Sequence, residues 1–187
     1  LAIRVGNKID KVISWKERNT MSAVGRFIME FQRNGLKEDD IFADAGGLGI
    51  PMCDALAAAG WTVHRVNNGE RAYDERHYLN RGAEIWFTAG RSIELNEVIL
   101  PDDDLLFSQI TTRKCKTNSK GKLQLESKDD MRSRGLPSPD RADAVLGAIA
   151  CGGSGVSLNL EPRPSFMAEL ANVQVGGELD MGFNAGY

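Results

Sequence analysis

Two aspartates from distant parts of the chain have the types and settings of metal ligands. Asp44 follows an apolar stretch, residues 41–43, and precedes a turn with three glycines. Asp143 lies one turn inside a predicted helix that is otherwise small and apolar. A carboxylate at the end of a buried strand is costly unless a cation or hydrogen-bond donors meet it. We therefore expect Asp44 and Asp143 to share a divalent cation, because Mg²⁺ and Mn²⁺ prefer oxygen ligands.

A strand, a turn and a helix are expected to position Asp44. Glycines at 46, 47 and 49 allow a turn that a Cβ would obstruct. Apolar residues then recur at helical spacing from 50 to 57, Gly60 ends that helix, and 61–66 alternates as a strand. Upstream, 1–5 and 11–15 predict a hairpin, and apolar residues at 24, 27, 28 and 31 predict an amphipathic helix. This order indicates an α/β fold with a mixed sheet flanked by helices.

The second half of the chain is expected to position Asp143. A helix at about 80–89 would turn Ala83, Trp86 and Phe87 inward and Arg81 and Glu84 outward. A short helix at 102–110, a basic β-hairpin within 111–126 and a short charged helix at 127–135 follow. Ser138 and Pro139 then make a favourable start for the helix that carries Asp143.

Length and composition predict one domain and a tail. With 187 residues, 42% of them apolar, the chain can bury a core at 1–151, and 152–187 is interpreted as a Gly/Ser linker and C-terminal tail. Three widely separated cysteines suggest neither a disulfide framework nor a zinc cluster, which fits a reducing, cytoplasmic compartment. No apolar run approaches 18 residues and no signal peptide is recognised, so we expect no contact with a membrane.

Positive charge is concentrated in one segment. The chain has a net charge of −3, but residues 113–141 hold nine Lys or Arg against four acids. Five lysines are candidates to meet DNA phosphates without reading sequence; the alternative is a hairpin that lysine merely keeps soluble. They are Lys114, Lys116, Lys120, Lys122 and Lys128.

Two further acids are secondary site candidates, and one glycine-rich stretch suggests a different function. Asp140 is interpreted as a solvent-facing charge at a helix N-terminus, and Asp54 as a surface acid or one that supports the site. The GGLG stretch before a helix also suggests a dinucleotide-binding turn. Met52 at the third glycine position and Asn67 and Asn68 where a ribose-binding acid is expected weaken that reading.

Three segments together resemble the nuclease domain of tailed-phage terminase large subunits. They are FADAGGLGIPMCDALAAAGWTVHRVN, YLNRGAEIW and GKLQLESKDDMRSRGLPSPDRADAV. The resemblance implies an RNase H-like fold and a metal-dependent endonuclease that cuts concatemeric double-stranded viral DNA. Such nucleases use three acids, and Asp44 and Asp143 match the second and third.

The first acid has no match in this sequence. In the family it lies on a strand that precedes the segment read here as 1–5, and Asp10, in a turn, is a poor substitute. We expect that strand to belong to the natural protein; without it, activity should fall severely. With a complete site, two metal ions about 4 Å apart would support in-line hydrolysis.

The resemblance also implies partners. These are an upstream ATPase domain, since this chain has no P-loop, together with the portal ring and the small terminase subunit, in the cytoplasm of an infected bacterial host. Two alternatives stay open: a catalytically silent RNase H-like scaffold that binds DNA or the portal, and another RNase H-like nuclease such as a junction resolvase.

Overall fold

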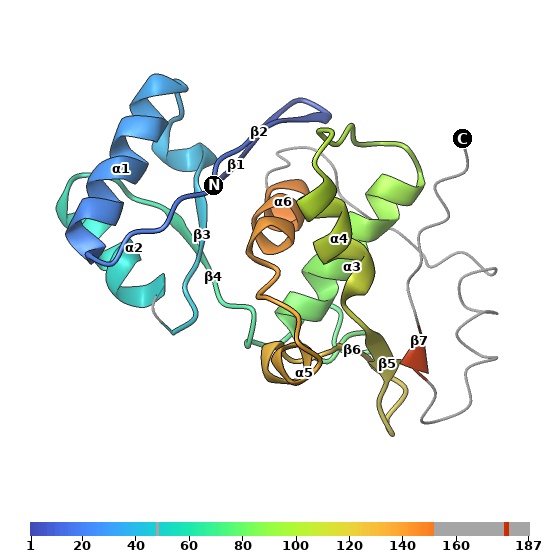
Figure 1. The fold of residues 1–187 in the computed structure, drawn as a ribbon. Coiled ribbons are helices and arrows are strands. Elements are labelled where there is room, and N and C mark those ends of the chain that lie inside the picture. The colour runs from blue at the N-terminus through green and yellow to red at the C-terminus, as the bar shows by residue number, and fades with distance from the viewer. Residues whose placement is uncertain (48, 152–177, 180–187) are drawn as a thin grey trace.

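The computed structural model describes residues 1–47, 49–151 and 178–179, and shows a mixed α/β fold in which small sheets are flanked by helices (Figure 1). This agrees with the α/β class expected from the sequence. In chain order the elements are β1 (Ala2–Val5), β2 (Lys8–Val12), α1 (Thr20–Arg33), the 3₁₀ turn η1 (Glu38–Asp40), β3 (Phe42–Asp44), α2 (Gly49–Ala58), β4 (His64–Val66), α3 (Arg81–Glu94), α4 (Asp104–Thr112), β5 (Cys115–Thr117), β6 (Leu123–Leu125), α5 (Lys128–Ser133), α6 (Asp140–Cys151) and β7 (Glu178–Leu179).

The described strands form three small sheets rather than one. β1 and β2 are an antiparallel hairpin, as expected, although β2 begins earlier in the chain than predicted. β3 and β4 pair in parallel, and β5 lies between β6 and β7, antiparallel to both. Within the described part of the chain, β1 and β3 therefore each pair along a single edge.

Two separate apolar cores lie on either side of β3 and β4. In Figure 1, α1 and α2 lie on one side of this strand pair, and α3, α4 and α6 lie on the other. One core contains side chains of α1 and α2, and the other is built on α3, α4 and α6. The buried members include Val24, Phe31, Cys53 and Leu56 in the first core, and Ile9, Leu106, Val145 and Leu146 in the second.

Local signals placed most helix ends correctly. Asn19, Asn80 and Ser127 cap α1, α3 and α5 by accepting hydrogen bonds from backbone N–H groups of the first turn. Gly35 and Gly60 follow α1 and α2 with positive φ, where glycine is favoured. None of the helices in the described residues combines the length and apolarity that crossing a bilayer requires.

One predicted orientation is wrong. Glu84 was expected to face solvent, but it is buried, with 7% of its surface exposed. Its carboxylate accepts hydrogen bonds from the backbone N–H groups of Tyr73 and Asp74 and pairs with Arg81. These partners compensate the cost of burying its charge. The predicted linker and tail, 152–187, lie outside the described residues except for β7.

Candidate metal centre

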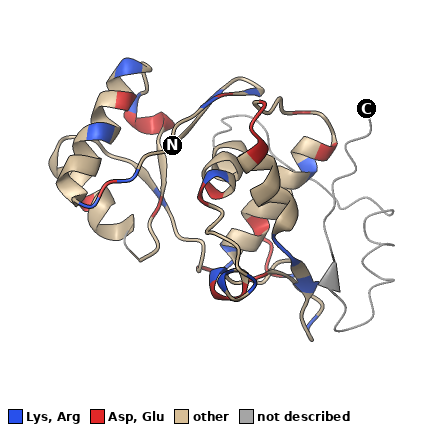
Figure 2. Ribbon diagram, viewed as in Figure 1, with Lys and Arg blue, Asp and Glu red and all other residues tan. Residues whose placement is uncertain are grey.

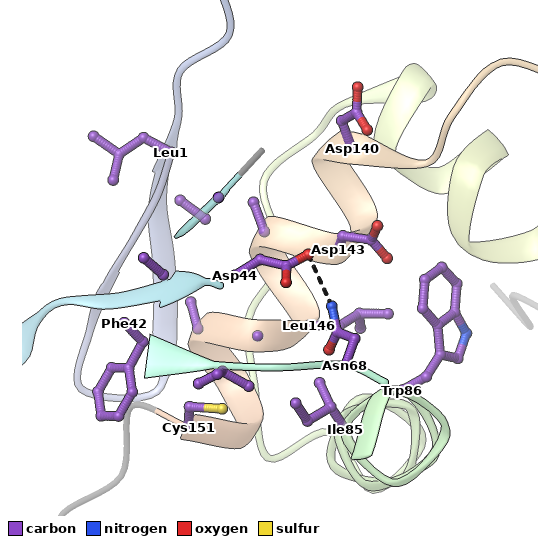
Figure 3. A pocket seen from close by; sticks show the side chains of 18 of the residues that line it. Leu1, Phe42, Asp44, Asn68, Ile85, Trp86, Asp140, Asp143, Leu146 and Cys151 are labelled. Atoms are coloured by element: carbon purple, nitrogen blue, oxygen red, sulfur yellow. Dashed lines mark hydrogen bonds between the residues drawn. The ribbon is translucent and has the colours of Figure 1, made fainter. Parts of the chain in front are cut away.

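A pocket of about 1150 Å³ opens between β1 and β3 and is lined on one side by α6. Both Asp44 and Asp143 line it. Figure 3 shows Asp44 reaching from the end of β3 toward α6, the helix that carries Asp143. The structure therefore brings to one pocket the two acids that the sequence selected.

The Asp44 side chain is held by two hydrogen bonds, one from the glycine turn and one from just beyond the end of β4. Its Oδ1 accepts a hydrogen bond from the backbone N–H of Gly46 at 2.9 Å, and its Oδ2 accepts one from Nδ2 of Asn68 at 3.1 Å (Figure 3). A Cβ on Gly49 would lie only 1.8 Å from the Asp44 carbonyl oxygen, so only glycine fits there. Because the Gly46 amide is used by Asp44, the turn is disfavoured as a dinucleotide site, where loop amides hold phosphate.

The expected burial of Asp44 is not observed. Asp44 is exposed and Phe42, on the same strand, is 38% exposed. The physical reason is that the edge of β3 away from β4 is not paired within the described residues and faces the pocket. Because water solvates the Asp44 carboxylate, the protein can fold without a cation bound there. The exposed carboxylate is also accessible to a cation from solution.

Two cations hold Asp143, one on each carboxylate oxygen. Arg113 Nη1 lies 3.3 Å from Oδ1, and Lys128 Nζ lies 2.7 Å from Oδ2. Arg113 is nearly buried, whereas the Lys128 side chain is 41% exposed. Burial lowers the pKa of Arg113, although the charges of Asp143 and Glu126 oppose that shift. Asp143 is thus neutralised by protein groups when no ion is bound.

The secondary acidic candidates differ in position. Asp140 lines the pocket but points away from Asp44 in Figure 3, and it accepts a hydrogen bond from Ser138 Oγ at 2.5 Å. Asp54 lies on α2, does not line the pocket, and pairs with Arg65 at 2.6 Å. Its side chain is 61% exposed, which suits a surface acid.

The predicted basic hairpin is present, with one lysine elsewhere. Lys116 and Lys120 are exposed on the β5–β6 hairpin, and Lys114 and Lys122 are partly buried there. Figure 2 shows basic residues along β5 and both signs of charge on α5. Lys128 lies on α5, within the short charged helix expected at 127–135, and contacts Asp143.

Sequence reasoning missed three residues near the two acids: Asn68, Arg113 and Trp86. Asn68 follows β4, which runs parallel to β3. Parallel strands end at the same edge of a sheet, so the closeness of Asn68 to Asp44 could have been predicted. Arg113 and Trp86 had no comparable local signal, because their contacts depend on how three helices pack.

The pocket supplies some of the ligands that a hard divalent cation needs. Asp44 and Asp143 supply carboxylate oxygens, which suit Mg²⁺ or Mn²⁺. Within residues 1–47, 49–151 and 178–179, no group of three acidic, His or Cys side chains is arranged to hold a metal ion. A complete site would therefore require a further ligand.

Comparison with known proteins identifies the fold. No family model matches the chain, and no curated protein matches it significantly. Among solved structures, the nuclease domain of the large terminase subunit gp2 of bacterial virus Sf6, in a mutant form with manganese and β-thujaplicinol, has a TM-score of 0.72 at 17% identity over 81% of each chain. A calcium-containing form gives 0.69 at 18% identity, over 80% of this chain and 81% of that one. A further structure of the Sf6 gp2 nuclease domain gives 0.64 at 17% identity, over 81% of each chain. The chain has the fold of this nuclease domain.

Proposed function

We propose that this chain is the nuclease domain of a tailed-phage terminase large subunit and cuts concatemeric double-stranded DNA by metal-dependent hydrolysis. The observation that carries the proposal is the pocket shared by Asp44 and Asp143 in a fold like that of a terminase nuclease. Structures of the Sf6 domain with manganese and with calcium support a divalent ion as its cofactor.

The roles of the two acids follow from their settings. Asp44 and Asp143 would hold Mg²⁺ or Mn²⁺, with two ions in a complete site. Bound ions would activate a water molecule for attack and stabilise the charge on the leaving 3′ oxygen. Asn68 and the Gly46 amide orient the Asp44 carboxylate through the hydrogen bonds described above. Such supporting hydrogen bonds fix the direction in which a ligand presents its lone pairs.

The hairpin lysines would bind the DNA backbone. Lys116 and Lys120 are exposed, and Lys114 and Lys122 flank them on the same hairpin. Phosphate contacts of this kind give affinity without sequence selection. Changing both Lys116 and Lys120 to Ala is expected to lower the slope of log affinity against log salt by about two. An unchanged slope would favour the view that these lysines only keep the hairpin soluble.

A further strand beside β1 and β3, beyond those in the described residues, would complete the metal site. β1 and β3 both contact α6, and each has an edge left unpaired within the described residues. The pocket between them is lined by apolar side chains of both cores, including Phe31 and Leu56 from one and Trp86 and Leu146 from the other. An apolar extended segment fits such a space, because it would pair with two edges and bury both faces. An acid on it would supply the third carboxylate.

Hydrogen exchange tests this strand. In the natural full-length protein, amides of residues 2–5 and 42–44 should exchange much more slowly than in a protein limited to residues 1–187, because the added strand covers the open edges. Equal exchange in both proteins would contradict the added strand. It would leave Asp44 and Asp143 as candidates that need another third ligand.

Nuclease activity is tested by removing each acid separately. Asp44→Asn and Asp143→Asn in the full-length protein should each lower Mn²⁺-dependent cleavage of double-stranded DNA by about 100-fold or more. Mutating a residue that only hydrogen-bonds to a metal ligand already lowers metal affinity or activity by about 10–100-fold, and loss of the ligand itself should cost at least as much. Asp54→Asn is the matched control and should cleave normally, because Asp54 pairs with Arg65 away from the pocket. Equal losses in all three variants would contradict the assignment.

The same variants separate the alternatives. A DNA- or portal-binding scaffold would show no cleavage in the unaltered protein and no effect of either substitution. A junction resolvase would depend on the same acids but would prefer branched DNA to linear duplex. We favour the terminase because the solved structures reported above, which share this fold, are of a terminase nuclease domain.

The proposal extends to the assembly in which the domain works. It includes an upstream ATPase domain, the portal ring and the small terminase subunit as partners, and the cytoplasm of the infected bacterium as the place of action. Co-purification of the full-length protein with portal and small subunit from infected cells tests these partners. Recovery of the protein free of both would count against them.

A further inference from the structure

We infer that Arg113 is a positioning residue for Asp143, and that it fixes the carboxylate so that Oδ2 faces the incoming metal ion. This inference rests on the proposed metal-dependent function. Arg113 follows α4 as its C-cap and stands immediately before the hairpin. Its guanidinium reaches Asp143 on α6, thirty positions further along the chain.

The guanidinium of Arg113 is held from three directions. Its Cζ lies 4.6 Å from the centre of the Trp86 ring, its Nε donates to the Glu126 carbonyl at 3.1 Å, and its Nη1 donates to Asp143 Oδ1 at 3.3 Å. Trp86 is itself buried, at 3% exposed. A planar group fixed on an aromatic face and by a backbone acceptor has little freedom to rotate. Asp143 Oδ1 therefore meets a donor whose position is set by the core.

Arg113 and Lys128 differ in how readily they can leave Asp143. Lys128 contacts Oδ2 through a flexible side chain that is 41% exposed, so solvent can replace the carboxylate at its ammonium. Arg113 has 10% of its side chain exposed and would leave its aromatic and carbonyl partners if it moved. Lys128 would therefore give up Oδ2 to a bound cation, whereas Arg113 would stay on Oδ1 and keep the carboxylate aligned.

A conservative substitution distinguishes positioning from charge. Arg113→Lys keeps the positive charge but loses the planar fork and the stack on Trp86. Full-length protein carrying Arg113→Lys should bind Mn²⁺ about 10–100-fold more weakly, as measured by electron paramagnetic resonance of free Mn²⁺. Trp86→Leu should give a loss in the same direction, and the two losses should not add, because both act through one guanidinium.

The control is a surface arginine that forms an ion pair and, within the described residues, is not packed against an aromatic ring. Arg132 pairs with Asp129 on the surface of α5, with 70% of its side chain exposed, so Arg132→Lys should leave Mn²⁺ affinity unchanged. Normal Mn²⁺ affinity in Arg113→Lys would overturn the positioning role even if that variant were less stable. Absence of Mn²⁺ binding in the unaltered protein would overturn the proposed function, and this inference with it.

Discussion

Gly49, at the start of α2, leaves no room for a Cβ beside the backbone of Asp44, the proposed metal ligand, so Gly49→Ala is a sensitive test of the site. A Cβ on Gly49 would lie 1.8 Å from the Asp44 carbonyl oxygen and 2.9 Å from its carbonyl carbon. Since a contact shorter than 3.0 Å forces a shift, α2 and the end of β3 must separate by about 1.2 Å. Backbone forms both sides of this contact, so no side-chain rotation relieves it.

The consequence for catalysis can be estimated from that shift. A displacement of about 1 Å in a catalytic group typically costs about 100-fold in rate, and forced overpacking costs about 1–3 kcal/mol of stability. Gly49→Ala should therefore lower Mn²⁺-dependent cleavage of linear duplex DNA by about 100-fold, measured well below its melting temperature. The Asp44 side chain is unchanged, so the loss would arise from position alone.

Gly25→Ala is the matched control. Gly25 lies inside α1, and a Cβ there would meet nothing within 4 Å. Alanine should raise stability by about 0.5–1 kcal/mol and leave cleavage unchanged. Wild-type cleavage by a folded Gly49→Ala protein would refute the reasoning, since the end of β3 would then not need its present position.

Three further outcomes follow from the charges and thiols. Lys128→Ala should raise Mn²⁺ affinity about fivefold in a resonance titration, because a half-exposed ion pair of about 1 kcal/mol no longer competes for Asp143; weaker binding would contradict this. Hydrogen bonds from Arg134 hold the pKa of Glu126 below its ordinary value of 4.5, so its contribution to stability is present above pH 4.5 and is lost as pH falls through the lower, folded pKa. Glu126→Gln should therefore reduce the fall in melting temperature that the protein shows as the pH drops below 4.5. An unchanged fall would exclude the Glu126–Arg134 pair as its cause. Burial raises the pKa of Cys115 to about 11, so mass-spectrometric mapping at pH 8 should find it unalkylated until the protein unfolds; rapid labelling in the folded state would contradict its burial.

Local signals account for most of what the sequence predicted correctly. The strand, glycine turn and helix around Asp44 depend on residues close in sequence, and the structure reproduces them as β3, the turn and α2. Helix starts at Asn80 and Ser127 were similarly accessible, because capping is a property of a few consecutive residues. Placing Asp44 and Asp143 together needed more than local signals: it was inferred from the chemistry of two carboxylates in apolar settings, and the family resemblance gave the same pair.

The errors concern contacts between segments far apart in sequence. Glu84 lies on the outer face of α3 by periodicity, yet residues 73–74 fold over it and supply two backbone N–H donors. Periodicity describes a helix in isolation and cannot show which loop will cover it. The contact of Lys128 with Asp143 likewise joins α5 to α6 and was not predicted from the sequence, which suggested for Lys128 only a contact with DNA.

The central claim is that Asp44 and Asp143 hold the same metal centre, and anomalous diffraction tests it most directly. Crystals of the full-length protein soaked in Mn²⁺ should show anomalous density coordinated by oxygens of both carboxylates, with Lys128 moved off Asp143. Mn²⁺ density at one acid alone, or at a place where neither carboxylate coordinates it, would contradict the account.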